Sequence, residues 1–122
     1  MPSVTVWMAV AAGGAVGAVS RWFIALRLND SLPFGTLLVN VVGSFAIGLL
    51  FVWLGDKEAS ELWRAGLITG LLGGFTTFSA FSLETLQLIE RGALKTALLY
   101  AAGSLIICVI ASLAGVVLAR SF

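Results

Sequence analysis

The sequence contains no histidine, a single cysteine and few charged side chains. With Cys108 as its one thiol, a chain cannot form an internal disulfide, and it cannot assemble a zinc site from Cys and His ligands. The seven Lys/Arg and six Asp/Glu residues amount to 11% of the 122 residues, whereas a soluble domain carries about a quarter. These charges are too few to cover a water-facing surface. The net charge of +1 gives no indication of a nucleic-acid partner.

Long apolar stretches take the place of charge. Hydrophobic residues make up 60% of the chain, and the mean hydropathy is +1.09. A helix needs about 20 mainly apolar residues to cross the hydrocarbon core of a bilayer. Four stretches meet this requirement, roughly residues 4–26, 34–54, 62–88 and 93–119. We therefore predict an all-α membrane protein in lipid, a single domain over residues 1–122 whose first segment is a retained helix rather than a cleaved signal.

The positive charges give almost no instruction about orientation, although Lys/Arg asymmetry normally fixes it. Four spans place both termini on one side of the membrane, together with Lys57, Arg64 and Arg120. The opposite side holds Arg27, Arg91 and Lys95, and also Arg21 if that side chain reaches the interface. Such a chain can insert both ways, and two opposite copies can then pair as an antiparallel dimer. The alternative is that another factor fixes one orientation.

Small residues recur at a spacing of four in every predicted span. This spacing lets helix backbones approach closely in lipid, where no hydrophobic force drives helices together. The residues concerned are Gly13 and Gly17, Ser44 and Gly48, Gly66, Gly70 and Gly74, and Ala111 and Gly115. Together they predict tight packing and an oligomer interface.

Polar side chains inside the spans are expensive in lipid, so their positions carry functional information. Asn40 lies about seven residues into the second span, where its carboxamide either joins two helices or faces a polar path. In the fourth span Tyr100, Ser104, Cys108 and Ser112 recur at i+4 and form one polar stripe. A lone serine would bond back to its own helix. Four residues in register are more typical of the wall of a polar path.

Glu84 and Arg21 are the acid and the base that lie deepest in the predicted spans, each near one end of its helix. Either side chain could extend to the membrane interface, which is the common behaviour of such residues. At a pore mouth, Arg21 would attract anions. Glu84 alone would indicate proton or cation traffic.

The stretch GGFTTFSAFS, residues 73–82, predicts a break in the third span. Irregular backbone at membrane depth survives where it is buried in protein or lines a cavity. Freed carbonyls suit a hard cation, and freed amides suit an anion. The alternative is a close-packed glycine kink whose hydroxyl groups cap their own backbone. After the break, Phe78 and Phe81 share one helix face. They either pack against lipid and core or turn their positive ring edges toward an anion.

With these motifs, the chain resembles the Fluc (CrcB) fluoride channels along nearly its whole length. The resemblance rests on GGAVGAVSRW at 13–22, GTLLVNVVGSFAIG at 35–48 and TGLLGGFTTFSAFSLET at 69–85. It implies a dual-topology antiparallel homodimer in the bacterial cytoplasmic (inner) membrane, with two pores that export cytoplasmic fluoride passively. It also implies a structural Na⁺ at the dimer centre, held by backbone carbonyls of both subunits.

The resemblance also implies roles for individual residues. The Na⁺ ligands match the carbonyls of Gly73 and Thr76, and Arg21 matches the family's arginine near the vestibule. The stripe on the fourth helix matches the family's polar track, although the thiol of Cys108 is a poorer donor there than a hydroxyl. The implied fluoride pore is formed by Asn40, Thr77, Phe78, Phe81, Tyr100, Ser104 and Ser112.

Two other classes compete with this hypothesis. A small dual-topology proton-coupled multidrug antiporter also has four spans, but it needs a titratable carboxylate in its binding cavity. The first span has none, and Glu84 lies near a helix end. A structural or assembly subunit would transport nothing, and Asn40→Ala would then affect folding or association alone. An enzyme is not expected, because the sequence has no nucleophile–base pair, metal cluster or nucleotide-binding loop.

Overall fold

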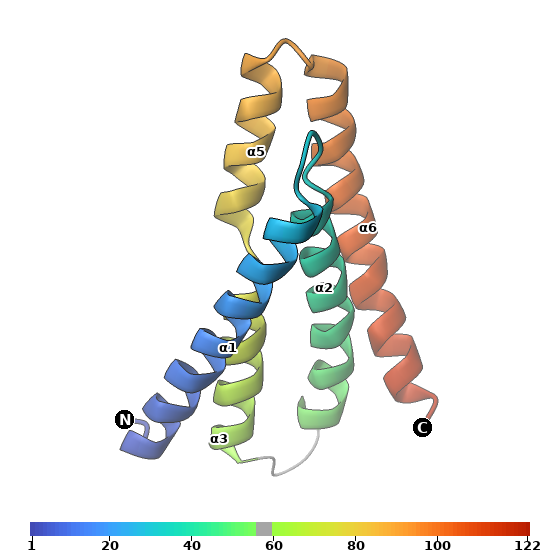
Figure 1. Cartoon of the computed structure of the whole chain (residues 1–122). Coiled ribbons are helices and arrows are strands. Elements are labelled where there is room, and N and C mark those ends of the chain that lie inside the picture. Colours follow the sequence, from blue (N-terminus) through green and yellow to red (C-terminus); the bar gives the residue numbers. More distant parts are fainter. Residues whose placement is uncertain (56–59) are drawn as a thin grey trace.

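The computed structural model describes residues 1–55 and 60–122, and these residues form helices joined by short loops (Figure 1). α1 covers Val4–Leu28, α2 covers Phe34–Gly55 and α6 covers Leu94–Arg120, while the third span covers Glu61–Glu90. Each of the four is long and apolar enough to cross a membrane. The prediction of an all-helical protein with four spans is therefore confirmed for the described residues. The chain is a multi-pass membrane protein, and both termini lie at the same end (Figure 1).

The third span is assembled from four pieces and is broken near its middle. Its pieces are α3 (Glu61–Arg64), the π-helix η1 (Ala65–Leu72), α4 (Gly73–Phe75) and α5 (Phe78–Glu90). Between α4 and α5, Thr76 and Thr77 have extended backbones, with ψ angles of 156° and 122°. The break thus lies within the predicted stretch. The π-helical geometry was not predicted; two glycines of η1 weaken its preference for α-helix.

Specific side chains define the helix ends. Ser3 caps α1, because its hydroxyl accepts a hydrogen bond from the Val6 amide. Asn29 Oδ1 caps the start of α2 by accepting from the Gly35 and Thr36 amides at 2.8 and 3.2 Å. α5 ends at Glu90 and is followed by Arg91 and by Gly92, whose φ of 79° suits glycine. The turn formed by residues 91–93 then leads directly into α6.

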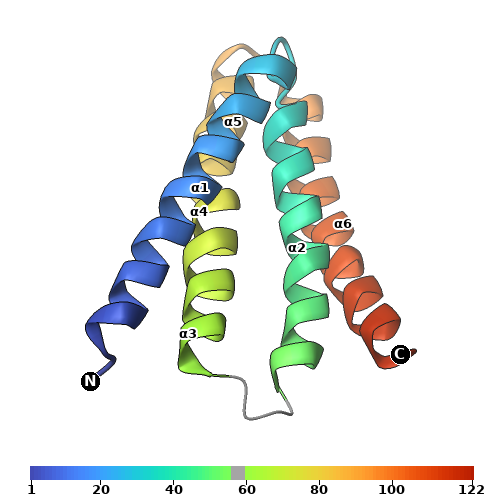
Figure 2. The ribbon, with the colours of Figure 1, turned by 60° about the horizontal axis from the view of Figure 1, so that its bottom comes forward.

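The helices associate as two pairs, and glycines lie where the backbones meet. α1 packs along η1 and α4, and α2 packs along α6 (Figure 2). A Cβ atom added to Gly48 would lie 2.2 Å from the Ser112 carbonyl oxygen, and one added to Gly115 would lie 2.2 Å from the Phe45 carbonyl oxygen. Both positions therefore admit no larger side chain without moving a helix.

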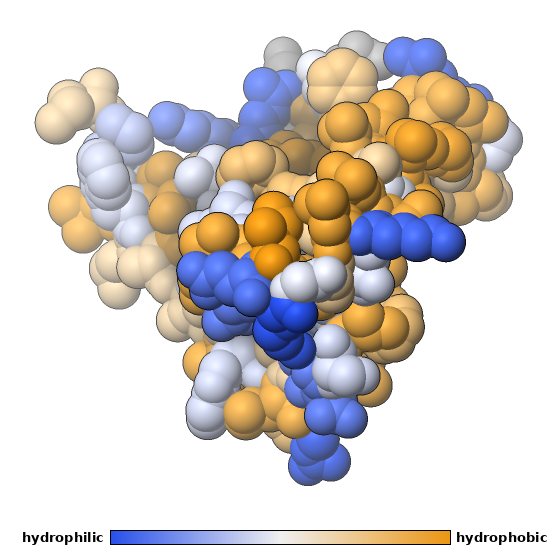
Figure 3. All heavy atoms as spheres, turned by 90° about the horizontal axis from the view of Figure 1, so that it is seen from above, coloured by the Kyte–Doolittle hydropathy of each residue, from blue (hydrophilic) through white to orange (hydrophobic). Residues whose placement is uncertain are grey.

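The chain buries few side chains within itself. The two helix pairs meet near the α1–α2 loop and diverge toward the end that carries the termini (Figure 2). Hydrophobic side chains spread over the outside, with hydrophilic ones in separate groups (Figure 3). The buried apolar residues are Val6, Val39, Leu72, Leu88, Ala97 and Ala119. Many of the polar residues that the sequence places inside the spans face an open groove between the two helix pairs.

Candidate functional site

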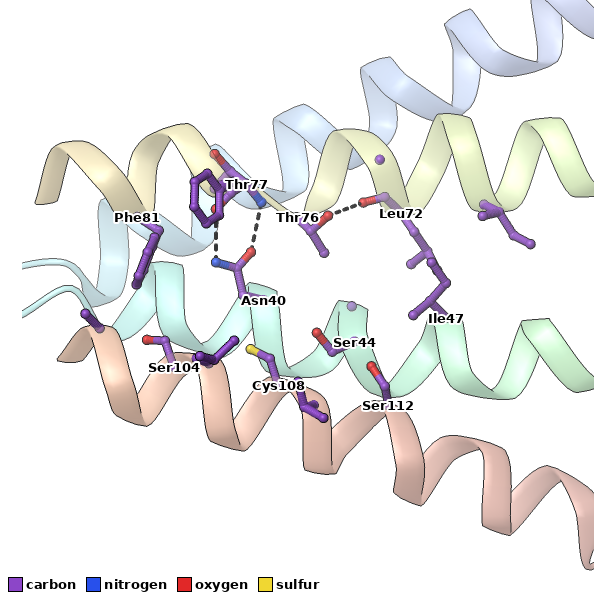
Figure 4. A pocket seen from close by; sticks show the side chains of 17 residues that line it. Asn40, Ser44, Ile47, Leu72, Thr76, Thr77, Phe81, Ser104, Cys108 and Ser112 are labelled. Atoms are coloured by element: carbon purple, nitrogen blue, oxygen red, sulfur yellow. Dashed lines mark hydrogen bonds between the residues drawn. The ribbon is translucent and has the colours of Figure 1, made fainter. Parts of the chain in front are cut away.

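A groove of about 730 Å³ lies between α2, the third span and α6 (Figure 4). Its lining side chains are apolar or neutral polar, and none of those described carries a charge. Eight of the ten predicted site residues line it: Asn40, Gly73, Thr76, Thr77, Phe78, Phe81, Ser104 and Ser112. The break, the aromatic pair Phe78 and Phe81, and most of the polar stripe are therefore brought together by the fold.

Asn40 joins α2 to the break. Its Nδ2 donates to the Thr77 carbonyl at 3.0 Å, and its Oδ1 accepts from the Thr77 amide at 2.8 Å (Figure 4). One carboxamide thus satisfies both backbone groups of a residue that has left the helical ladder, as buried backbone groups require. Asn40 does connect two helices, as one interpretation expected. It also lines the groove.

Two carbonyls at the break lose the amides that a continuous helix would offer them. In an α-helix the Thr77 amide would bond to Gly73 and the Ala80 amide to Thr76. Here the Thr77 amide bonds to Asn40, and the Ala80 amide bonds to the Thr77 hydroxyl at 3.1 Å. The Gly73 and Thr76 carbonyls are thereby deprived of those partners, which makes them candidate ligands for a hard cation.

The hydroxyl groups at the break bond to their own helix, as the alternative interpretation expected. Thr76 Oγ1 donates to the Leu72 carbonyl at 2.9 Å, and Thr77 Oγ1 caps α5. The threonine hydroxyls therefore bond within the third span, whereas the Gly73 and Thr76 carbonyls lose the amide partners of a continuous helix.

Three aromatic rings lie in series, and two of them, Phe78 and Phe81, line the groove. The ring centroids of Phe78 and Phe81 are 5.4 Å apart, those of Phe81 and Tyr100 are 5.3 Å apart, and both pairs are tilted by 41°. Aromatic rings carry partial positive charge at their edges and partial negative charge on their faces, so they avoid a direct face-to-face arrangement. Phe78 is 79% exposed in the single chain. Tyr100 does not line the groove itself and reaches it through contact with Phe81.

The polar stripe of α6 forms one wall of the groove. Ser104, Cys108 and Ser112 all line it (Figure 4). Ser104 is buried, and its Oγ has no hydrogen-bond partner among the described residues. A buried hydroxyl without a partner is costly and needs an explanation such as water or an ion.

A second polar cluster surrounds Glu84 and was not foreseen as a unit. Oε1 of Glu84 accepts from Thr36 Oγ1 at 2.6 Å and from Asn29 Nδ2 at 3.2 Å, while Oε2 accepts from the Tyr100 hydroxyl at 2.8 Å. The carboxylate is therefore directed inward rather than extended toward the interface. Asn29 was missed altogether; its place in a turn shortly before Pro33 was the available signal.

Arg21 lies outside the set of residues that line the groove. Its Nε donates to the carbonyl oxygen of Gly74 at 3.0 Å, so it contacts the last helical turn before the break. The vestibule role that the resemblance implies for Arg21 stays a prediction. The structure adds a backbone partner on the third span.

Comparisons with a family profile and with individual relatives give matches along most of the chain. The family profile described as CrcB-like protein, Camphor Resistance (CrcB), matches residues 8–116. A fluoride-specific ion channel FluC of Caulobacter vibrioides (strain NA1000 / CB15N) is 47% identical over 117 residues, which cover 91% of this chain and 92% of the relative. The FluC protein of Agrobacterium fabrum is also 47% identical, with 92% and 94% covered.

A further relative, the fluoride-specific ion channel FluC of Bordetella petrii, is 53% identical over 102 residues, which cover 82% of this chain and 80% of the relative. The matched stretches include the break, the asparagine that binds it and most of α6, because the profile extends from α1 almost to the end of the chain. On these grounds the chain is a member of the CrcB family.

Proposed function

We propose that this protein is a passive, fluoride-selective ion channel that exports cytoplasmic fluoride across the bacterial inner membrane. The relatives are named as fluoride-specific ion channels rather than as enzymes or transporters of other substrates. The observation that best supports the proposal is the groove itself. Its described lining residues carry no charge, and they include two phenylalanine rings and the Ser104 hydroxyl, which has no partner among the described residues. Passive flow follows the electrochemical gradient, so export needs no energy source of its own.

We further propose that two copies pair in antiparallel orientation. A break in the middle of a span is tolerated where protein or a water-filled cavity covers it. In one chain Gly73 and Phe78 are exposed beside that break. A second copy seated against the groove would cover both, and an oppositely oriented copy is available because the charges favour neither orientation. Each copy would then contribute one groove, which gives two pores per dimer.

The chemistry of the groove suits fluoride. A small, strongly hydrated anion needs close donors to replace its water, and it gains from the positive edges of aromatic rings. Phe78 and Phe81 offer such edges, and Ser104 and Ser112 offer hydroxyl groups on the facing wall. None of the described lining residues is a cation, so none of them would hold the anion too tightly for it to leave. Chloride, which is larger and less strongly hydrated, would gain less.

A structural Na⁺ fits the break. A hard cation prefers oxygen ligands, and the Gly73 and Thr76 carbonyls are the ones whose helical amides bond elsewhere. Bound there, the ion would supply fixed positive charge that ties the two copies together at their centres. The residues of this chain would hold the carbonyls in place: Asn40 through Thr77, and Thr77 through the amide of Ala80.

The direct test measures anion efflux from liposomes that contain the purified protein, read with a fluoride electrode and then with a chloride electrode. We expect rapid fluoride release and negligible chloride release. Purified dimers that release no fluoride would overturn the proposal. Crosslinking or size measurement on the same preparation would show separately whether the protein is dimeric.

We expect Phe78→Ile and Phe81→Ile each to reduce fluoride efflux by at least about tenfold, which corresponds to about 1.4 kcal/mol of lost stabilisation for the ion. Isoleucine keeps the apolar volume but removes the ring edge. Efflux is compared with that of Phe51→Ile, which changes an exposed ring of α2 that does not line the groove. Unchanged efflux through either groove variant would remove that ring from the pore.

The antiporter alternative depends on Glu84, and its surroundings do not favour it. The carboxylate accepts three hydrogen bonds and does not line the groove. A carboxylate that exchanges protons for a drug must be open to that drug. We therefore expect no proton-driven efflux of a cationic dye from liposomes, for the wild type or for Glu84→Gln. Dye efflux that requires a pH gradient and disappears in Glu84→Gln would support the antiporter instead.

A further inference from the structure

Arg21 makes a contact that the proposed pore chemistry does not use. Its Nε–H group donates to the Gly74 carbonyl across 53 positions of sequence. Arg21 lies on α1, and Gly74 lies in α4, two residues before the extended backbone begins. The guanidinium thus acts on the backbone of the broken helix rather than on a side chain.

The position of Arg21 is fixed by close backbone packing. A Cβ atom added to Gly17 would lie 2.2 Å from the Leu71 carbonyl oxygen and 2.7 Å from the Phe75 amide nitrogen. One added to Gly74 would lie 2.5 Å from the Gly14 carbonyl oxygen. α1 therefore lies directly against the turn that precedes the break. Arg21 follows Gly17 by one helical turn, so its side chain starts from this contact.

The contact divides the carbonyls at the break into two kinds. The Gly74 carbonyl accepts a hydrogen bond from a charged donor, and such bonds are stronger than neutral ones. A metal cation would be repelled from an oxygen already bound to a guanidinium. The neighbouring Gly73 and Thr76 carbonyls keep no helical amide, since those amides bond to Asn40 and Thr77. A cation at the break would therefore bind the Gly73 and Thr76 carbonyls rather than the Gly74 carbonyl.

We propose that Arg21 is a positioning residue that sets the cation site by occupying the Gly74 carbonyl and holding α1 against the turn before the break. This inference rests on the proposed function, because it assigns a role within the Na⁺ site. It differs from a vestibule role, in which the charge of Arg21 alone draws anions toward the pore. Lysine separates the two, because it keeps the charge and has no N–H group at the position of the guanidinium Nε.

The experiment measures fluoride efflux from liposomes while Na⁺ is replaced stepwise by N-methylglucamine. The variants are Arg21→Lys and Arg21→Gln, with Arg27→Lys as the matched control. Arg27 lies on the same helix, but its guanidinium packs over the Phe23 ring, 4.8 Å from the ring centroid. We expect both Arg21 variants to need about tenfold more Na⁺ for half-maximal efflux, the equivalent of one lost charged hydrogen bond. Arg27→Lys should match the wild type.

Each outcome decides the inference. Arg21→Lys with a normal Na⁺ requirement, beside an impaired Arg21→Gln, would assign the residue to charge alone and overturn it. Normal behaviour of both variants would overturn it as well. If fluoride efflux through the wild-type protein does not depend on Na⁺, the Na⁺ site itself is overturned, and the inference with it. That result is distinct from the comparison of the variants. If a variant does not fold by itself, the same Na⁺ titration is made on dimers of one variant and one wild-type chain. An unshifted Na⁺ requirement in these dimers counts against the proposal.

Discussion

Fluoride efflux through the Asn40→Leu variant should fall at least about tenfold, because the substitution leaves two backbone groups of Thr77 without partners. Each unsatisfied buried group costs about 1–3 kcal/mol. Leucine has nearly the same size, so the change removes the hydrogen bonds at 2.8 and 3.0 Å rather than the packing. The freed Thr77 amide can then return to the Gly73 carbonyl, which would close the break. Efflux with the fluoride electrode gives the measurement.

Two further variants define the cause of that loss. Asn40→Asp keeps the acceptor for the Thr77 amide but cannot donate to the Thr77 carbonyl when it is ionised, and it adds negative charge to the groove. We expect it to conduct less than the wild type. Gln87→Leu removes an exposed carboxamide of α5 and serves as the matched control, with unchanged efflux expected. An Asn40→Leu protein that is dimeric and conducts normally would exclude Asn40 from both the break and the pore.

Gly48→Ala and Gly115→Ala should each destabilise the protein by about 2 kcal/mol or more, which is the usual effect of adding volume to a closely packed contact. At both positions the new methyl group would lie 2.2 Å from a carbonyl oxygen of the other helix. A backbone atom cannot turn aside as a flexible side chain can, so α2 and α6 must separate. The loss of stability is measured by thermal unfolding in detergent, with the fraction of protein that stays soluble and monodisperse as the readout.

Gly103 provides the control for this pair. It lies on α6 as Gly115 does, but a Cβ atom added there meets nothing within 4 Å. Gly103→Ala should be neutral or stabilising by up to about 1 kcal/mol, because alanine favours helix more than glycine does. A comparable loss in Gly103→Ala and Gly115→Ala would mean that the α2–α6 contact is not the cause.

The spans could be predicted because they depend on local composition. Long apolar stretches, the turn near Pro33 and the charged residues between spans mark the helices without any knowledge of packing. The break was also predictable, since Gly73 and Gly74 followed by two threonines weaken a helix locally. The π-helix Ala65–Leu72 was not, because a π-turn depends on how the helix fits its neighbour.

The contacts within the site were mostly beyond prediction from sequence. Thr36 and Glu84 are 48 positions apart, and Asn40 and Thr77 are 37 positions apart, so their hydrogen bonds depend on how three spans come together. The sequence identified Asn40 and Glu84 as costly polar groups in lipid but not their partners. For Arg21 it indicated an interfacial charge, whereas the packing of α1 on the third span gives it a backbone oxygen.

The sparse interior of the single chain affects how the stability of the protein is defined. Val39 is the largest side chain that is fully buried, and the two helix pairs diverge around an open groove. If the groove is closed by a second copy, most of the packing that defines the native state forms between chains. Folding and association then become one equilibrium, which shifts as the protein is diluted. Within a bilayer the relevant variable is the number of lipids per chain, so a sparsely populated membrane would lower the native fraction without any change in temperature or sequence.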